Sequence, residues 1–187
     1  TKLTKGKCGV CEKICPTKAI KFDDKEEFVN KEVGAIVMAT GYDLFNWEEA
    51  YGEYGYGKYP DVISGLHFER LVSAGGPTGG KIKRPSDGKE PKSVAFIKCV
   101  GSRDDTKGKS YCSRACCMYT AKHAYQVKDK IADSEAYVFY MDVRTAGKNY
   151  EEFYQRALNA GARYIRGRVS KIYPRGDRLV LKTEDSL

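Results

Sequence analysis

Seven cysteines are the most reactive side chains of this chain, and their spacing divides them into two groups. Because seven is an odd number, the thiols cannot all pair with one another in internal disulfides. Residues 16–98 contain no cysteine. Thiols grouped in this way favour metal binding in a reducing compartment over a secreted disulfide framework. The N-terminal cysteines are Cys8, Cys11 and Cys15, and the central cysteines are Cys99, Cys112, Cys116 and Cys117.

The N-terminal cysteines follow the pattern Cys-x-x-Cys-x-x-x-Cys-Pro, which is the end of the bacterial ferredoxin run C-x-x-C-x-x-C-x-x-x-C-P. Lys5 stands where the first cysteine of that run belongs, so the ligand set of this first cluster is partial. Its missing ligands lie upstream, or the cluster has three irons, or it is lost. A zinc knuckle or free thiols are the alternative, and the sequence Cys-Pro-x-x-Ala-Ile at residues 15–20 favours iron–sulfur.

The central cysteines have the spacing Cys-x12-Cys-x3-Cys-Cys. Four thiolates at this density suit a 4Fe-4S cluster, because soft sulfur ligands select iron–sulfur clusters or zinc. The adjacent pair Cys116 and Cys117 is awkward for a single tetrahedral zinc ion, whose cysteine ligands are usually separated by a few residues. A larger cluster can accept neighbouring thiolates on different irons. A reactive thiol or a disulfide pair is the alternative interpretation.

Two further features would suit a flavin. Thr40 and Gly41 end an apolar segment, as the Ala-Thr-Gly sequence beside the flavin does in flavoproteins with two dinucleotide domains. Lys122 follows Cys117 on the same expected helix, where it is either a surface residue or a cation that stabilises a reduced, anionic flavin. No G-x-G-x-x-G occurs in the chain, so a complete flavin or nicotinamide site cannot be derived from it.

An α/β fold has to position these side chains. The apolar run 33–41 predicts a buried strand that ends in a glycine turn. Residues 42–90 hold many of the glycines and tyrosines of the chain, and we expect them to be irregular apart from one short helix near 67–73. Strand, helix, strand, helix and strand then alternate, which predicts βαβ units on a parallel sheet. The expected strands are 93–97, 136–141 and 163–165, the helices 112–131 and 150–160, and the hairpin strands 169–173 and 179–182.

The composition excludes several classes of protein. The chain has 187 residues, of which 41% are hydrophobic, so it can bury a core and is not a disordered tail. Neither a run of ~18 apolar residues nor a signal peptide is present, so we expect no membrane span and a cytoplasmic location. The net charge of +8 includes a loose basic cluster at residues 81–92 without interleaved aromatic residues. Such a cluster favours a solvated face or an acidic partner, and we expect no nucleic-acid binding.

Longer motifs occur along almost the whole chain. They are VGAIVMATGY at residues 33–42, GYGKYP at 55–60, GPTGG at 76–80, RPSDG at 84–88, CVGSRD at 99–104, YCSRACCMYTAK at 111–122, and residues 140–154. Together these motifs resemble the A subunit of heterodisulfide reductase, a flavin- and iron–sulfur-bearing family of methanogens and many anaerobic bacteria. The resemblance covers nearly all of the chain and identifies it as an internal fragment of a longer subunit.

This resemblance implies a Rossmann-like fold, namely a thioredoxin-reductase-type nicotinamide domain remodelled around an iron–sulfur cluster, with a ferredoxin-like remnant at the N-terminus. Residues 1–24 then match the end of an inserted ferredoxin module. Residues 25–91 match the return strand of the flavin domain and a connecting segment, and residues 92–187 match the cluster-binding domain. FAD belongs to the full-length subunit, where Lys122 matches a lysine that can lie near the isoalloxazine ring.

The implied activity is electron transfer between FAD and 4Fe-4S clusters in an electron-bifurcating complex of the CoB–CoM heterodisulfide reductase type. The implied partners are other heterodisulfide reductase subunits, a hydrogenase or formate dehydrogenase module, and ferredoxin. We expect the full-length subunit to be dimeric and this segment alone not to be catalytic. The alternatives are a related flavoprotein subunit of a quinone-interacting or other anaerobic respiratory complex, and a zinc-stabilised, non-redox interaction module.

Overall fold

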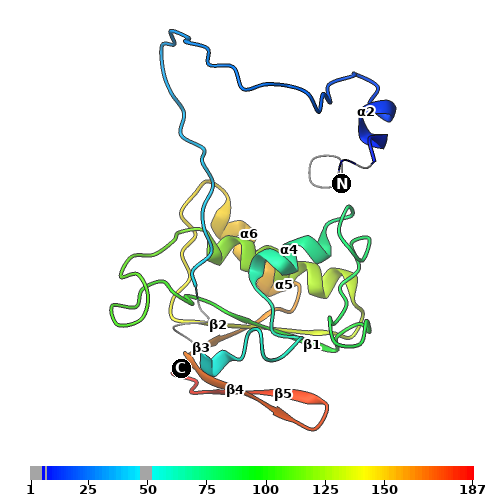
Figure 1. The fold of residues 1–187 in the computed structure, drawn as a ribbon. Helices are drawn as coiled ribbons and strands as arrows, with labels where there is room; N and C mark the ends of the chain where they lie inside the picture. The colour runs from blue at the N-terminus through cyan, green and yellow to red at the C-terminus, as the bar shows by residue number, and fades with distance from the viewer. Residues whose placement is uncertain (1–5, 7, 47–51) are drawn as a thin grey trace. The chain divides into compact units, whose positions relative to one another are not determined.

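The computed structural model describes residue 6, residues 8–46 and residues 52–187, so Lys5 lies outside the described residues. Contacts between residues divide the chain into two compact units, Thr1–Tyr42 and Asp43–Leu187 (Figure 1). The domain boundaries expected after residues 24 and 91 remain predictions.

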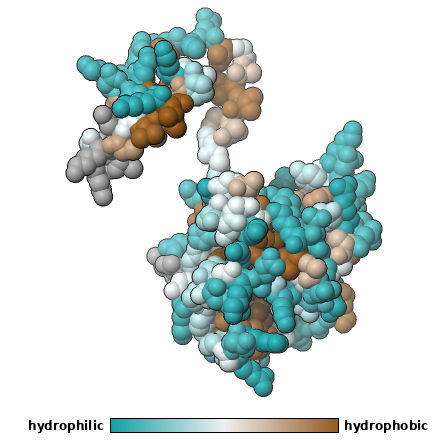
Figure 2. Space-filling view, turned by 90° about the vertical axis from the view of Figure 1, so that its right-hand side faces the viewer, coloured by the Kyte–Doolittle hydropathy of each residue, from teal (hydrophilic) through white to brown (hydrophobic). Residues whose placement is uncertain are grey.

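Among its described residues, the N-terminal unit contains one short helix, α2 (Val10–Ile14), followed by chain that forms neither helix nor strand. Residues 33–41 form no strand and are exposed, with Val37 89% accessible, and Figure 2 shows apolar residues on the surface of this unit. The buried strand predicted there is therefore wrong for this chain. A buried strand needs neighbours that pair its backbone and cover its side chains, and no strand is described in this unit. Gly41 does adopt the positive φ, +77°, that the expected glycine turn requires.

The larger unit is built on a parallel sheet in the order β1-β2-β3. In register, Phe96 lies opposite Val138, and Val138 opposite Tyr164. Figure 1 shows helices α4, α5 and α6 on one side of this sheet and the β4–β5 hairpin on the other. The predicted α/β class and parallel sheet are confirmed. The strands are β1 (Ser93–Ile97), β2 (Glu135–Tyr140) and β3 (Arg163–Arg166), and α5 (Cys116–Lys130) and α6 (Tyr150–Asn159) connect them.

The helix ends follow from local backbone conformation. Helix α5 begins at Cys116, later than the predicted start at residue 112, because Arg114 has a left-handed φ of +61° that a helix cannot contain. Helix α6 stops where expected, since Gly161 adopts a φ of +91° and its N–H donates to the Leu158 carbonyl at 2.8 Å. The short helix expected near residues 67–73 is α4 (Gly65–Val72), whose N-cap Ser64 Oγ accepts the His67 N–H at 3.2 Å.

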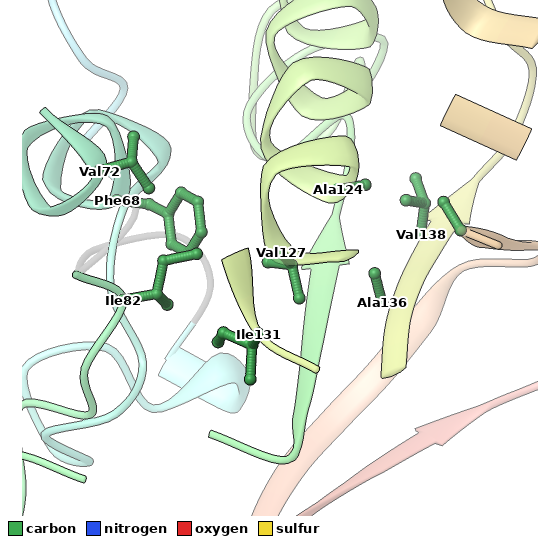
Figure 3. Packing of buried hydrophobic residues seen from close by; sticks show 9 residues of the cluster. Phe68, Val72, Ile82, Ala124, Val127, Ile131, Ala136 and Val138 are labelled. Atoms are coloured by element: carbon green, nitrogen blue, oxygen red, sulfur yellow. The ribbon is translucent and has the colours of Figure 1, made fainter. Parts of the chain in front are cut away.

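Two hydrophobic clusters pack against the sheet, one on each of its faces. On the helix side, Phe68 and Val72 of α4 pack with Val127 of α5 and Val138 of β2 (Figure 3). Each such side chain stabilises the fold by roughly 1.5–3 kcal/mol when it is fully buried. On the opposite side, Phe139 packs with residues of the hairpin strands β4 (Val169–Arg175) and β5 (Arg178–Thr183) and of the 3-10 helix η1 (Gly52–Tyr54). The strand β2 therefore alternates its side chains between two cores, as a sheet covered on both faces does.

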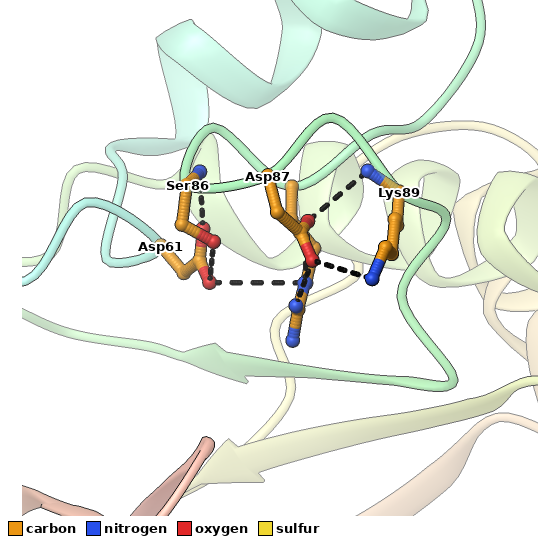
Figure 4. A network of polar contacts seen from close by, with 5 residues as sticks. Asp61, Ser86, Asp87 and Lys89 are labelled. Atoms are coloured by element: carbon orange, nitrogen blue, oxygen red, sulfur yellow. Dashed lines mark hydrogen bonds and ion pairs between the residues drawn. The ribbon is translucent and has the colours of Figure 1, made fainter.

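The basic cluster at residues 81–92 is partly neutralised by carboxylates. Arg84 is ion-paired with Asp87 and lies 4.0 Å from Asp61 (Figure 4). Asp61 also accepts hydrogen bonds from the Ser86 N–H at 2.9 Å and from the Ser86 hydroxyl at 2.7 Å. The guanidinium of Arg84 lowers the pKa of Asp87 to about 2. These contacts tie the loop to itself and reduce the positive charge that a partner would meet.

None of the helices in the described ranges has the length and apolar character needed to cross a lipid bilayer.

Candidate metal centre

The central cysteines lie where β1 ends and α5 begins. Strand β1 ends at Ile97, Cys99 follows two residues later, and Cys116 is the first residue of α5. The loop turns sharply, because Cys99 and Gly101 have φ values of +59° and +76°. A side chain at Gly101 would have its Cβ 2.2 Å from the Phe45 ring, so the turn accepts only glycine. The carboxyl edge of a parallel sheet is the edge at which such folds place their ligands.

Three of the four central thiols meet at this edge. Cys99, Cys116 and Cys117 are all buried. Their pKa values depend on one another, as expected of neighbouring thiols. The Cys116 thiol, helped by the charges of Lys98 and Arg103, lowers the pKa of Cys99 to about 7 despite its burial. The Cys116 thiol and burial together raise the pKa of Cys117. For Cys116, the Cys117 thiol lowers the pKa, but the Cys99 thiol and burial raise it more.

The surroundings of these three thiols are electropositive. The Arg144 N–H donates to the Cys117 Sγ at 3.3 Å. The Arg103 guanidinium contacts Cys99 and is held by an ion pair to the Asp142 carboxylate, with 2.6 Å between Nη1 and Oδ1. Amide and guanidinium donors of this kind stabilise thiolates and cluster sulfurs. The site therefore favours an anionic, sulfur-rich group.

Cys112 stands apart from the other three central cysteines. It precedes α5, and its Sγ accepts the Arg114 N–H at 3.3 Å. Across the described part of the chain, Cys112 makes no hydrogen bond to another thiol, and no three His, Cys, Asp or Glu side chains are arranged to hold a metal ion. The structure thus buries Cys99, Cys116 and Cys117 near one another, and ligation of a cluster by the four central cysteines remains a prediction.

One orphaned polar group supports the fit of an iron–sulfur group at this edge. The hydroxyl of Tyr164 is buried and has no hydrogen-bond partner among the residues that the structure describes. Burial raises its pKa, and the charges of Tyr154 and Cys117 add to the effect. A phenol in electrostatic range of Cys117 would find an acceptor in a cluster sulfur beside that thiol. The donor set and this unpaired hydroxyl therefore fit a thiolate-bound iron–sulfur group.

The N-terminal cysteines are not brought together in the same way. Cys8 and Cys11 are exposed, and the Cys15 Sγ lies 3.4 Å from the Thr17 hydroxyl, which lowers the pKa of Cys15. Helix α2 buries none of its residues, so no core fixes the relative positions of these thiols. In small metal-binding modules the bound metal itself often supplies that order. The first cluster therefore remains a prediction.

The predicted flavin-facing residues are divided between the two units. Thr40 and Gly41 are exposed residues of the N-terminal unit, and Lys122 lies on α5 of the larger unit. The Lys122 Nζ is 2.5 Å from Glu69 Oε2, and the same carboxylate oxygen is 2.5 Å from His123 Nε2. Lys122 therefore already has a carboxylate partner, and a flavin site that includes these three residues remains a prediction.

Sequence reasoning missed the side chains that surround the central cysteines. Lys98 directly follows a predicted strand, Tyr164 lies within another, and neither belongs to a recognised motif. The only sequence signal for Lys98 was its position, directly after the apolar strand 93–97 and directly before Cys99. For Tyr164 no sequence signal existed, because strand pairing alone brings β3 beside β2.

Comparison with known proteins shows what the chain is similar to. No family model matches the chain. Over 96% of its length it is 50% identical to the A subunit of the H2:CoB–CoM heterodisulfide,ferredoxin reductase of Methanothermobacter thermautotrophicus. It is homologous to part of the A subunit of heterodisulfide reductase.

Two other relatives agree with this assignment. The chain is 48% identical over 97% of its length to the iron-sulfur A subunit of the CoB–CoM heterodisulfide reductase of Methanocaldococcus jannaschii. It is 46% identical over 96% of its length to the A subunit of the ferredoxin/F420H2-dependent CoB–CoM heterodisulfide reductase of Methanosarcina acetivorans. The chain spans only 28%, 28% and 23% of the lengths of these three relatives, in the order given.

Proposed function

We propose that this chain is the electron-transfer portion of a flavin- and iron–sulfur-containing oxidoreductase subunit of the CoB–CoM heterodisulfide reductase type. One observation carries the proposal: the buried thiols of Cys99, Cys116 and Cys117 meet in an electropositive site. The names of the relatives, which include ferredoxin-linked reductases and an iron-sulfur subunit, support the same activity.

In this proposal the central cysteines hold a 4Fe-4S cluster, with Cys112 as the fourth ligand. Such a cluster accepts and releases single electrons. The chain's own contribution is to bury the three gathered thiols away from water and to hold the Arg144 N–H at 3.3 Å from the Cys117 Sγ. Arg103, locked by Asp142, adds a fixed positive charge beside Cys99. Burial and hydrogen bonds of this kind tune a cluster's reduction potential.

The finer fold belongs to the same proposal. A sheet in the order β1-β2-β3 with crossover helices suits half of a Rossmann-like domain. The turn after β1 is where such domains bind a pyrophosphate on a helix N-terminus. Here that turn carries Cys99 and leads to Cys116 and Cys117 at the start of α5, so a negatively charged cluster would replace the phosphate.

The remaining sites and partners are proposed for the longer subunit. The N-terminal cysteines would contribute to a second cluster, and Thr40, Gly41 and Lys122 would face FAD. A hydrogenase or formate dehydrogenase module would deliver electrons to the longer subunit in the cytoplasm. Bifurcation at the flavin would then send them to ferredoxin and to other heterodisulfide reductase subunits.

Substitution of Cys112 tests the central ligand set. In the chain purified without oxygen, we expect Cys112→Ala to abolish the visible absorption and the EPR signal of the cluster on the central cysteines, because it removes one of the four proposed ligands. The adjacent Ser113→Ala is the matched control and should leave both signals intact. An unchanged spectrum in Cys112→Ala would show that the four-cysteine assignment is wrong. Zinc at a stoichiometric level without iron in the unsubstituted chain would favour the zinc-stabilised module.

A further inference from the structure

Lys98 is a buried cation beside the candidate cluster. Its side chain is only 7% exposed. The Nζ donates to the backbone carbonyl of Asp142 at 3.2 Å and lies 5.6 Å from the centre of the Tyr140 ring. No carboxylate pairs with Lys98 in the described part of the chain.

Strand geometry explains why this lysine points at the thiols. The Lys98 N–H donates to the Phe139 carbonyl at 3.1 Å, so the ladder of β1 continues one residue past Ile97. Side chains alternate along a strand. Phe96 packs in the cluster on the helix side and Ile97 in the cluster on the hairpin side. The next residue, Lys98, therefore returns to the helix side, where α5 begins with Cys116 and Cys117.

The charges around Lys98 leave it without an anionic partner. The carboxylate of Asp142, whose backbone carbonyl Lys98 contacts, is 2.6 Å from Arg103 Nη1 and 3.6 Å from Arg144 Nε. The charge of Lys98 acts instead on the neighbouring thiols, where it adds to the larger effect of Cys116 in lowering the pKa of Cys99. A buried, uncompensated charge is strongly unfavourable. A negative group opposite Lys98 would compensate its charge.

We propose that Lys98 is a positioning residue that supplies the fixed counter-charge of the iron–sulfur cluster on the central cysteines and raises its reduction potential. The inference rests on the proposed function. One-electron reduction places one additional negative charge on the cluster. A neighbouring cation in a poorly polarisable environment stabilises that reduced form more than the oxidised form, because the attraction grows with the charge. In the experiment the electron comes from dithionite.

An anoxic redox titration followed by EPR tests the proposal. The chain would carry Cys8→Ser, Cys11→Ser and Cys15→Ser, so that only the cluster on the central cysteines contributes a signal. In this background, Lys98→Met keeps most of the buried apolar stem and removes the charge. We expect the midpoint potential to move to more negative values, by roughly a tenfold change in the equilibrium constant of reduction, or about 59 mV for one electron.

Two variants serve as controls for the charge. Lys98→Arg retains it and should keep the potential close to that of the unsubstituted chain. Lys171→Met removes a lysine from the exposed surface of the β4–β5 hairpin and should leave the potential unchanged.

The outcomes separate the inference from the proposed function. If Lys98→Met keeps its iron and its midpoint potential, Lys98 is not the counter-charge, and the cluster assignment still stands. If Lys98→Met loses its iron, recovery of iron and signal in Lys98→Arg supports the proposal, whereas loss in both variants overturns it in favour of a packing role. If the background chain binds no iron–sulfur cluster at all, the proposed function fails, and the inference fails with it.

Discussion

The behaviour of single residues in this chain depends on which partners the fold supplies. Cys99 and Cys112 have the same side chain, but the Cys116 thiol and the charge of Lys98 lower the pKa of Cys99, while the Cys112 Sγ accepts the backbone N–H of Arg114. His123 is another case. It is 1% exposed, it is ringed by aromatic side chains, and its Nδ1 has no partner among the described residues. Burial lowers the pKa of His123, although Glu69 opposes the effect.

This histidine should make stability depend on pH. Because the pKa of His123 is lower in the folded than in the unfolded chain, unfolding takes up a proton below a pH of about 6.5. Stability contributed by the neutral ring is therefore present above that pH and is lost as the pH falls, by up to about 1.4 kcal/mol per pH unit. We expect urea unfolding at pH 7.5 and pH 5.5 to show this loss, and His123→Phe to reduce it.

The second histidine of the chain provides the control. His67 is exposed on α4, so His67→Gln should leave the difference between the two pH values unchanged. The same pH dependence in His123→Phe as in the unsubstituted chain would contradict the assignment.

At the scale of elements, helix α4 connects the glycine-rich segment to the βαβ core. Its apolar face buries Phe68 and Val72 against α5, while Leu66 on the same helix faces solvent. The Phe68 ring also makes an edge contact with Phe96 of β1, with 5.4 Å between ring centres. Through these contacts the segment that precedes β1 becomes part of the same core as the sheet.

Replacing the buried aromatic residue of α4 should weaken the whole larger unit. We expect Phe68→Ala, at a side chain that is 5% exposed, to lower the free energy of unfolding by about 3–5 kcal/mol, because it leaves a cavity between α4 and α5. Leu66→Ala, at a side chain that is 49% exposed, should cost less than about 1 kcal/mol. Chemical denaturation of both variants measures the difference, and equal losses would show that α4 does not pack as described.

At the scale of the whole molecule, the two compact units differ in how they are held together. The larger unit has two hydrophobic clusters, whereas the N-terminal unit leaves apolar side chains such as Ile36, Val37 and Met38 in solvent. Apolar burial is the main force that stabilises a fold. The larger unit therefore contains most of the folding free energy of this chain.

It follows that the larger unit should fold without the N-terminal unit. We expect a chain of residues 43–187 to keep the far-UV circular dichroism of its helices and sheet and the thermal midpoint of the full chain. Anoxic preparation of both forms keeps their thiols comparable. A truncated chain that lacks a cooperative transition would show that the N-terminal unit is required for the core.

Much of this architecture follows from local patterns. The alternation of apolar strands with amphipathic helices after residue 92 was sufficient to predict the βαβ order and the parallel sheet, because both periodicities are properties of short segments. The stop of α6 at Gly161 was predictable for the same reason. Cysteine spacing likewise indicated which residues were candidates for a cluster. Each of these inferences needs only neighbours along the chain.

Long-range contacts determined the rest. Cys99, Cys116 and Cys117 meet because β1 and α5 share one edge of the sheet, and Arg114, in a left-handed conformation that spacing does not reveal, leaves Cys112 outside the helix. The apolar run 33–41 has the pattern of a buried strand, but its side chains are exposed. A strand is stable only beside other strands that pair with it, and none is described in this unit. Amino-acid order thus specified the elements and the candidate ligands, and packing selected the thiols that meet and the lysine that faces them.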